Sequence, residues 1–183
     1  MTNKTAEATT KVVTGKVRFS YAHVHEPHAI EEGQTKKYSV SILIPKKDRA
    51  TLNKINNAIG VAYEQGKSEN KLPTLTVCKT PLRDGDEEKP DNEEYEGMMF
   101  MNASSYNKPQ IVDENTEPIM SKEQFYSGCF GRASVNFYAY GKKVPSKGIA
   151  CGLNNLQFLE DGENLAGSGS SAADDFAEED SLY

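Results

Sequence analysis

The stretch Gly131-Arg-Ala-Ser-Val-Asn-Phe-Tyr-Ala-Tyr140 decides the fold class, because apolar and polar residues alternate along its whole length. Successive side chains of a strand point to opposite faces, so the alternation predicts a half-buried strand. The residues expected to face the core are Ala133, Val135, Phe137 and Ala139. The residues expected to face outward are Arg132, Ser134, Asn136, Tyr138 and Tyr140.

Strand patterns recur on both sides of this stretch, over residues 12–21, 38–44, 98–105, 111–112 and 149–159. In the first of them, Val13, Gly15, Val17, Phe19 and Tyr21 share the face expected to point inward. Apolar residues at helical spacing predict one substantial helix that Asp48 caps, that runs to about Gln65 and that Gly66 ends. The pattern indicates a mainly β fold, an OB-fold-like antiparallel barrel of five to six strands with one helix.

Charge is distributed unevenly along the 183 residues, whose formal net charge is -6. Residues 160–183 hold eight acids and no Lys or Arg, and residues 84–96 hold eight more acids against Lys89 alone. Without these two segments the remaining chain carries a charge of +9. We therefore expect a flexible arm over 1–10, a basic domain over 11–160 with an acidic loop at 84–96, and a disordered acidic tail over 161–183.

Several classes of protein are disfavoured by composition. No apolar run approaches the roughly 18 residues of a membrane span, and Met1 to Thr10 lacks the apolar core of a signal peptide. The three cysteines are odd in number and have no CxxC spacing, which fits a reducing cytoplasm better than a disulfide scaffold. We expect no membrane association.

No signature of catalysis or of a metal site is complete. Glycine-rich phosphate loops, hydrolase elbows and zinc-protease motifs are missing. The acidic loop resembles the start of an EF-hand, but Lys89 replaces the required glycine and Tyr95 the bidentate glutamate, so a mobile surface loop is expected. His23 and His25 share one side of an extended segment but have no identifiable third ligand. No catalytic residue, metal or cofactor is predicted.

Binding of nucleic acid fits the outward strand faces and nearby loops better. Single-strand binders combine cations that follow phosphates with flat rings on which unpaired bases stack. The candidate DNA-binding residues are Lys16, Arg18, Tyr106, Lys108, Arg132, Asn136, Tyr138, Tyr140, Lys142, Lys143 and Lys147. No compact set of Asn, Gln and Arg suited to reading base edges is found, so binding without strong sequence preference is expected.

Six stretches and a short acidic-aromatic end also resemble a known family, the OB-fold single-stranded-DNA-binding proteins of tailed bacteriophages. The stretches are Val13-Thr-Gly-Lys-Val-Arg-Phe-Ser-Tyr21, Lys37-Tyr-Ser-Val-Ser-Ile-Leu-Ile-Pro-Lys46, Pro81-Leu-Arg-Asp-Gly-Asp86, Phe125-Tyr-Ser-Gly-Cys129, Val135-Asn-Phe-Tyr-Ala-Tyr140, Gly148-Ile-Ala-Cys-Gly-Leu153 and Asp174-Asp-Phe176. The chain departs from the family pattern at His23 and His25, where Asn or Phe types are expected.

The resemblance implies an OB barrel that binds single-stranded DNA during phage replication or recombination, with no enzymatic activity. It also implies an acidic tail that contacts phage or host replication proteins, in the cytoplasm of the infected bacterium. The tail residues expected to do so are Asp174, Asp175, Phe176, Glu178, Glu179, Asp180 and Tyr183. The sequence leaves a homo-oligomer open, and two alternatives remain: a small metal-dependent nuclease and an acidic protein-binding adaptor.

Overall fold

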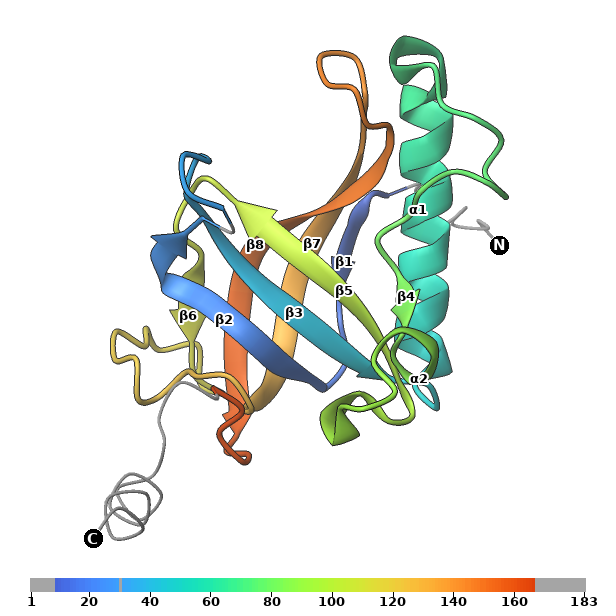
Figure 1. The fold of residues 1–183 in the computed structure, drawn as a ribbon. Helices are drawn as coiled ribbons and strands as arrows, with labels where there is room; N and C mark the ends of the chain where they lie inside the picture. The colour runs from blue at the N-terminus through green and yellow to red at the C-terminus, as the bar shows by residue number, and fades with distance from the viewer. Residues whose placement is uncertain (1–8, 30, 167–183) are drawn as a thin grey trace, which may run out of the picture.

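Five strands of the computed structural model, which describes residues 9–29 and 31–166, close into a barrel. They are β2 (Val17–His28), β3 (Lys37–Pro45), β5 (Met98–Ser105), β7 (Phe130–Tyr140) and β8 (Gly148–Glu160). The strands pair in the order β7-β2-β3-β5-β8, and a ladder between β7 and β8 completes the circle (Figure 1). Only the β5–β8 pair of this circle is parallel. The expected mainly β, OB-fold-like barrel with one substantial helix is confirmed, and the parallel β5–β8 pair departs from the antiparallel arrangement that was expected.

Three short strands extend the wall of the barrel. β1 (Lys11–Val13) pairs with β7, β4 (Arg83–Asp84) pairs with β5, and β6 (Gln110–Val112) pairs with β8. In the part of the chain that the structure describes, no helix has both the length and the apolar character needed to cross a membrane.

The core follows from the period-two pattern of the strands. Phe19, Ile42, Met101, Val135 and Leu156 come from the five barrel strands, and each is almost completely buried. Because alternate residues point inward, the intervening residues of β3 and β5 form an outer face, of which Leu43 and Phe100 are covered by Tyr95.

The predicted strand over residues 12–21 is interrupted. β1 ends at Val13 and β2 starts only at Val17. The buried Thr14 hydroxyl accepts a hydrogen bond from the Ala133 N–H at 3.0 Å, and the Gly15 N–H donates to the Thr51 hydroxyl at 2.9 Å. The interruption changes which residues face inward, so Val12 is buried and Val13 is 40% exposed. The expected inward orientation of Val13 was therefore wrong.

Helix α1 (Arg49–Asn70) packs against β7 and β1 and contributes Ile55 and Ile59 to the core. Its start was predicted correctly, because an Asp48 carboxylate oxygen accepts a hydrogen bond from the Thr51 N–H at 3.2 Å. Its end was not, since the helix continues through Gly66 to Asn70.

Gly66 serves close packing and does not end the helix. A Cβ atom at this position would lie 2.3 Å from Cβ of Ala139 in β7. The missing side chain therefore lets the helix axis approach the strand, a use of glycine that a sequence pattern does not separate from helix termination.

The acidic segment, residues 84–96, is ordered. It contains helix α2 (Gly85–Glu88) and the short 3-10 helix η1 (Glu93–Tyr95). Tyr95 is 1% exposed and packs edge-on against Phe100, with ring centroids 5.1 Å apart. Lys46 Nζ lies 2.8 Å from Asp84 and 2.7 Å from Asp86, and these hydrogen bonds lower the pKa of both carboxyls. An apolar anchor and a cationic clamp thus replace the expected mobile loop.

Candidate nucleic-acid interface

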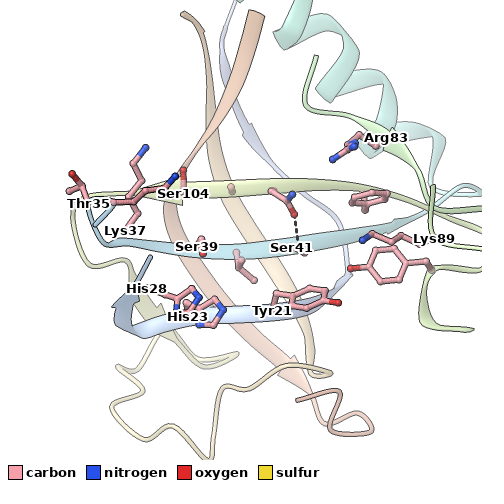
Figure 2. Close-up of a pocket in the computed structure, with 16 residues that line it drawn as sticks. Tyr21, His23, His28, Thr35, Lys37, Ser39, Ser41, Arg83, Lys89 and Ser104 are labelled. Atoms are coloured by element: carbon pink, nitrogen blue, oxygen red, sulfur yellow. Dashed lines mark hydrogen bonds between the residues drawn. The ribbon is translucent and has the colours of Figure 1, made fainter. Parts of the chain in front are cut away.

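The floor of the candidate interface is the outer face of β3 and β5. Ser39 and Ser41 lie opposite Ser104 and Asn102 in the ladder between these strands, so short polar side chains occupy adjacent positions. The Ser41 hydroxyl donates a hydrogen bond to Oδ1 of Asn102, drawn as a dashed line in Figure 2. Because these side chains are short, a flat ligand can come close to the sheet.

A groove runs over this floor, and its first arm is rich in cations. Lys37, Arg83 and Lys89 line it from β3, β4 and the acidic segment (Figure 2). None of the described residues that line this arm is an Asp or a Glu, although the acidic segment borders it. The first arm is therefore a positively charged channel over a polar floor.

Tyr21 lies along the first arm because of a backbone irregularity in β2. The pairing of β2 with β3 shifts register between Ser20 and His23, and Tyr21 adopts a φ of 46°. This left-handed conformation is costly for a bulky residue, of order 1–3 kcal/mol, and such strain gathers at functional sites. The ring is 56% exposed and lines the groove, so the expected inward orientation of Tyr21 was wrong.

His23 and His28 form a stacked pair in the same arm. Their ring centroids are 4.0 Å apart and their planes differ by 9° (Figure 2). Burial, and to a smaller extent the nearby His28, lowers the pKa of His23. The nitrogen lone pairs lie in two parallel planes and do not converge on one ion. His25, the partner considered for His23 in the sequence, instead places Nε2 2.8 Å from the Phe125 carbonyl.

The described residues include no cluster of side chains typical of a metal site. In residues 9–29 and 31–166 there is no group of three or more His, Cys, Asp or Glu side chains that could hold a metal ion. Burial raises the pKa of Cys129 to about 11.

Arg83 connects the first arm to a second arm of the groove. The second arm continues over β5 and β8, where Lys79, Tyr140 and Ala150 line it. Unlike the first arm, it also has carboxylates: Asp84, Glu87 and Glu88. Nε and Nη2 of Arg83 both donate to Oε1 of Glu88, at 3.0 and 2.8 Å.

Tyr106 lies beside the first arm and is 65% exposed. The Nζ atom of Lys37 lies 4.7 Å from the centroid of the Tyr106 ring, a cation–π geometry. A cation and an open aromatic face therefore occur together at the rim of the groove.

Part of the predicted DNA-binding set lies along the second arm. Tyr140 lines it, and Tyr138 pairs with Ala150, which also lines it. Lys142, Lys143 and Lys147 follow in the loop that joins β7 to β8. The Lys142 N–H donates to Oδ1 of Asn70 at 3.0 Å, which holds the start of this loop against the end of helix α1.

Other members of the predicted set have partners within the protein. Lys16 forms an ion pair with Glu160, and Arg18 donates to the carbonyls of Gly128 and Glu163, each at 3.1 Å. Arg132 Nε donates to the Thr14 carbonyl at 2.9 Å.

Two further predicted residues also lie away from both arms. Asn136 accepts a hydrogen bond from the Thr10 hydroxyl. Lys108 lies near Glu26, whose pKa is lowered mainly by the hydrogen bond from Lys122 and least by Lys108. The predicted tail residues, from Asp174 to Tyr183, lie outside the described part of the chain.

The sequence analysis missed several residues of the groove. Ser39 and Ser41 could have been found, because they are the polar members of an alternating strand pattern. Arg83 lies in one of the stretches that resemble the family, but the charge pattern did not select Arg83 or Lys89, because they stand next to and among eight acids. The pairing of Arg83 with Phe100 in the β4–β5 ladder and the packing of Tyr95 against the barrel bring this segment to the floor of β3 and β5.

Comparison with known proteins agrees with the resemblance drawn from the sequence. A family model described as "Enterobacter phage Enc34, ssDNA-binding protein" matches residues 10–182. The chain is also 29% identical over 184 residues to putative protein p50 of Acyrthosiphon pisum secondary endosymbiont phage 1, covering 94% of this chain and 98% of the relative.

Solved structures give the same result. The single-stranded DNA-binding protein from bacteriophage Enc34 in complex with ssDNA is 26% identical, with a TM-score of 0.76 over 86% of this chain and 90% of that one. The bacteriophage T7 protein gp2.5, a single-stranded DNA binding protein, is 13% identical, with a TM-score of 0.59 over 90% and 99%, and supports the fold. These relatives are described as binding proteins, in agreement with the expectation of a protein that is not an enzyme.

Proposed function

This chain belongs to the family of the Enterobacter phage Enc34 ssDNA-binding protein, and on that premise we propose that it binds single-stranded DNA in the groove over β3, β5 and β8. One observation carries the placement: the first arm combines three cations and exposed rings, and no described residue lining it is acidic. The acidic segment, residues 84–96, borders this arm directly, so positive and negative side chains are separated over a short distance.

The chemistry of the groove matches the two components of a single strand. Lys37 and Lys89 neutralise phosphates, and the rings of Tyr21, Tyr106 and Tyr140 stack on bases. The short side chains of the floor let unpaired bases approach the sheet. Rings and cations accept every base and phosphate, so preference among homopolymers stays within about tenfold.

The predicted residues outside the two arms remain predictions as DNA contacts. For Lys16, Arg18 and Arg132 the intramolecular partners favour a structural role, because each already satisfies donors on the protein. Tyr138 and the lysines of the β7–β8 loop extend the path beyond Tyr140, and we include them in the proposed interface.

In the cell, the proposed activity is the coating of single-stranded phage DNA during replication or recombination, in the cytoplasm of the infected host. Family membership supports the DNA-binding part of this proposal. Eight acids and no Lys or Arg over residues 160–183 support a role for the tail in recruiting phage or host replication proteins.

The test is a titration of labelled oligo-dT, followed by fluorescence anisotropy at several salt concentrations. Lys37→Ala should weaken binding and reduce the salt slope by about 0.7, the value for one phosphate contact on a single strand. Lys54→Ala is the matched control, because it removes one lysine from helix α1, outside both arms. If Lys37→Ala and Lys54→Ala bind oligo-dT with the same affinity and salt slope, the proposed position of the DNA is wrong. If the wild-type protein does not bind oligo-dT, the proposed function is wrong.

The same titration can include magnesium, with the length of the oligonucleotide checked on a gel. An uncut oligonucleotide is expected. Shortening that depends on magnesium would favour the nuclease alternative instead.

A further inference from the structure

Arg83 lies where the two arms of the groove meet, and its side chain is already engaged. It lines both arms, and Nε and Nη2 donate to one carboxylate oxygen of Glu88. The guanidinium carbon lies 5.6 Å from the centroid of the Phe100 ring, which supports it from the side of the barrel. The ion pair is about half exposed, so it is open to exchange with an anion from solution.

Glu88 differs from the other two carboxylates of the second arm. Asp84 is neutralised by Lys46, at 2.8 Å. Glu87 forms no ion pair within the described residues. Glu88 is therefore the carboxylate of this arm that forms an ion pair with Arg83, the cation that lines both arms.

Resting on the proposed function, we propose that Glu88 competes with DNA phosphate for Arg83 and thereby lowers the affinity for single-stranded DNA at the junction of the two arms. Carboxylates and phosphates recognise the same paired N–H groups of a guanidinium. With the Nε–Nη2 edge on Glu88, a phosphate must displace the carboxylate or accept a like charge beside it. Exposed ion pairs are weak, so displacement is feasible and costs affinity.

The backbone around Glu88 holds the carboxylate near the groove even after displacement. Gly85, at the start of α2, packs closely against the Tyr95 backbone, since a Cβ there would lie 2.5 Å from the Tyr95 carbonyl. The Gly97 N–H donates to Asp86 at 3.0 Å, and Lys46 holds the same carboxylate. A displaced Glu88 side chain therefore remains close to the phosphate that replaced it.

The test compares two substitutions that remove the same charge from the same helix. Glu88→Gln removes the ion pair but keeps shape and a hydrogen-bond acceptor for Arg83. Glu87→Gln removes a carboxylate that lines the same arm without touching Arg83. At low salt, Glu88→Gln should tighten binding of oligo-dT by about fivefold, the effect of one like charge about 4 Å away in water. The gain for Glu87→Gln should be clearly smaller, and both gains should shrink with added salt.

A second comparison isolates the role of Arg83. In an Arg83→Ala background, Glu88→Gln should gain no more than Glu87→Gln. Three outcomes would each overturn the proposal. The first is an equal gain in affinity from both substitutions when Arg83 is present, and the second is an undiminished gain from Glu88→Gln when Arg83 is absent. The third is weaker binding by Glu88→Gln than by wild type. Lys37→Ala keeps this result separate from the proposed function: if Lys37→Ala weakens binding and Arg83→Ala does not, the strand uses the groove without reaching Arg83, and only the competition is refuted.

Discussion

The Nζ atom of Lys37 lies 4.7 Å above the Tyr106 ring, so the two side chains bring a cation and a stacking surface to the same rim of the groove. Tyr106→Ala should weaken binding of oligo-dT by about 1–3 kcal/mol, the usual cost of losing one stacked base. Tyr106→Phe should bind nearly as well as wild type, because the face of the ring is retained. Fluorescence anisotropy measures both, and a Phe variant as weak as the Ala variant would contradict stacking.

The stacked histidines predict a pH dependence of DNA binding. The pKa of His23 is lowered in the free protein, so its ring stays neutral further below pH 6.5 than an ordinary histidine. A phosphate in the groove favours the protonated ring, so binding takes up a proton and affinity rises as pH falls below about 6.5. His23→Gln should flatten this rise, whereas His25→Gln, whose ring contacts the Phe125 carbonyl, should preserve it. Parallel pH profiles for wild type and His23→Gln would refute the assignment.

The same lowered pKa acts on stability with the opposite sign. Between about pH 6.5 and the lower pKa of folded His23, the unfolded chain binds more protons than the folded chain. The contribution of His23 to the free energy of unfolding therefore falls as pH drops through this range. Urea denaturation of wild type and His23→Gln at several pH values measures the difference.

Two glycines of helix α1 should respond oppositely to the same substitution. Gly66→Ala forces a methyl group against Ala139 and should cost about 1–3 kcal/mol, more than the gain in helix propensity of up to about 1 kcal/mol. Gly60→Ala meets no atom within 4 Å and should stabilise the protein by up to about 1 kcal/mol. Thermal unfolding compares the two, and Ala139→Gly should restore stability to Gly66→Ala. Stabilisation by both alanines would show that α1 does not need the close approach.

Truncation after Ala166 tests whether the acidic tail competes with DNA. This end point keeps the hydrogen bond from the Leu165 N–H to the Ser127 carbonyl, at 2.8 Å. The 17 residues removed can span at most about 60 Å, enough to return to the barrel. Binding of oligo-dT should tighten about two- to fivefold at low salt, and the gain should disappear at high salt. Unchanged affinity at both salt concentrations would show that the tail does not compete with DNA.

The barrel was predictable because its signals are local. Alternation over 131–140 and 38–44 and the cap at Asp48 each depend on residues close in sequence, and the structure has these elements. The errors at Val13, Tyr21 and Gly66 share another cause. Each residue is placed by a contact or a pairing irregularity that involves a distant strand. A period-two or period-3.6 pattern in the sequence does not report such long-range contacts.

The candidate site was less predictable than the fold. A search for outward-facing rings and cations finds Tyr106 and Tyr140, which flank or line the groove. It also selects Arg18 and Arg132, whose donors the structure shows on backbone carbonyls. Arg83 went unrecognised because its position depends on the two-residue pairing of β4 with β5 and on the burial of Tyr95 against Phe100. Neither contact is visible in the charge pattern of residues 84–96.

The pairing of β8 with both β5 and β7 also sets when the barrel closes during synthesis of the chain. Ala103 pairs with Cys151 and Ser104 with Gly152, so the wall of the barrel stays open until the last strand has left the ribosome. Until then β7 and the Ala103–Ser104 part of β5, beyond its pairing with β4, each present an unpaired edge, which is a template for association with other chains. The arrival of β8 covers both edges and supplies Ala150 to the second arm. The nascent chain thus covers its exposed edges and completes the second arm of the groove at the same moment.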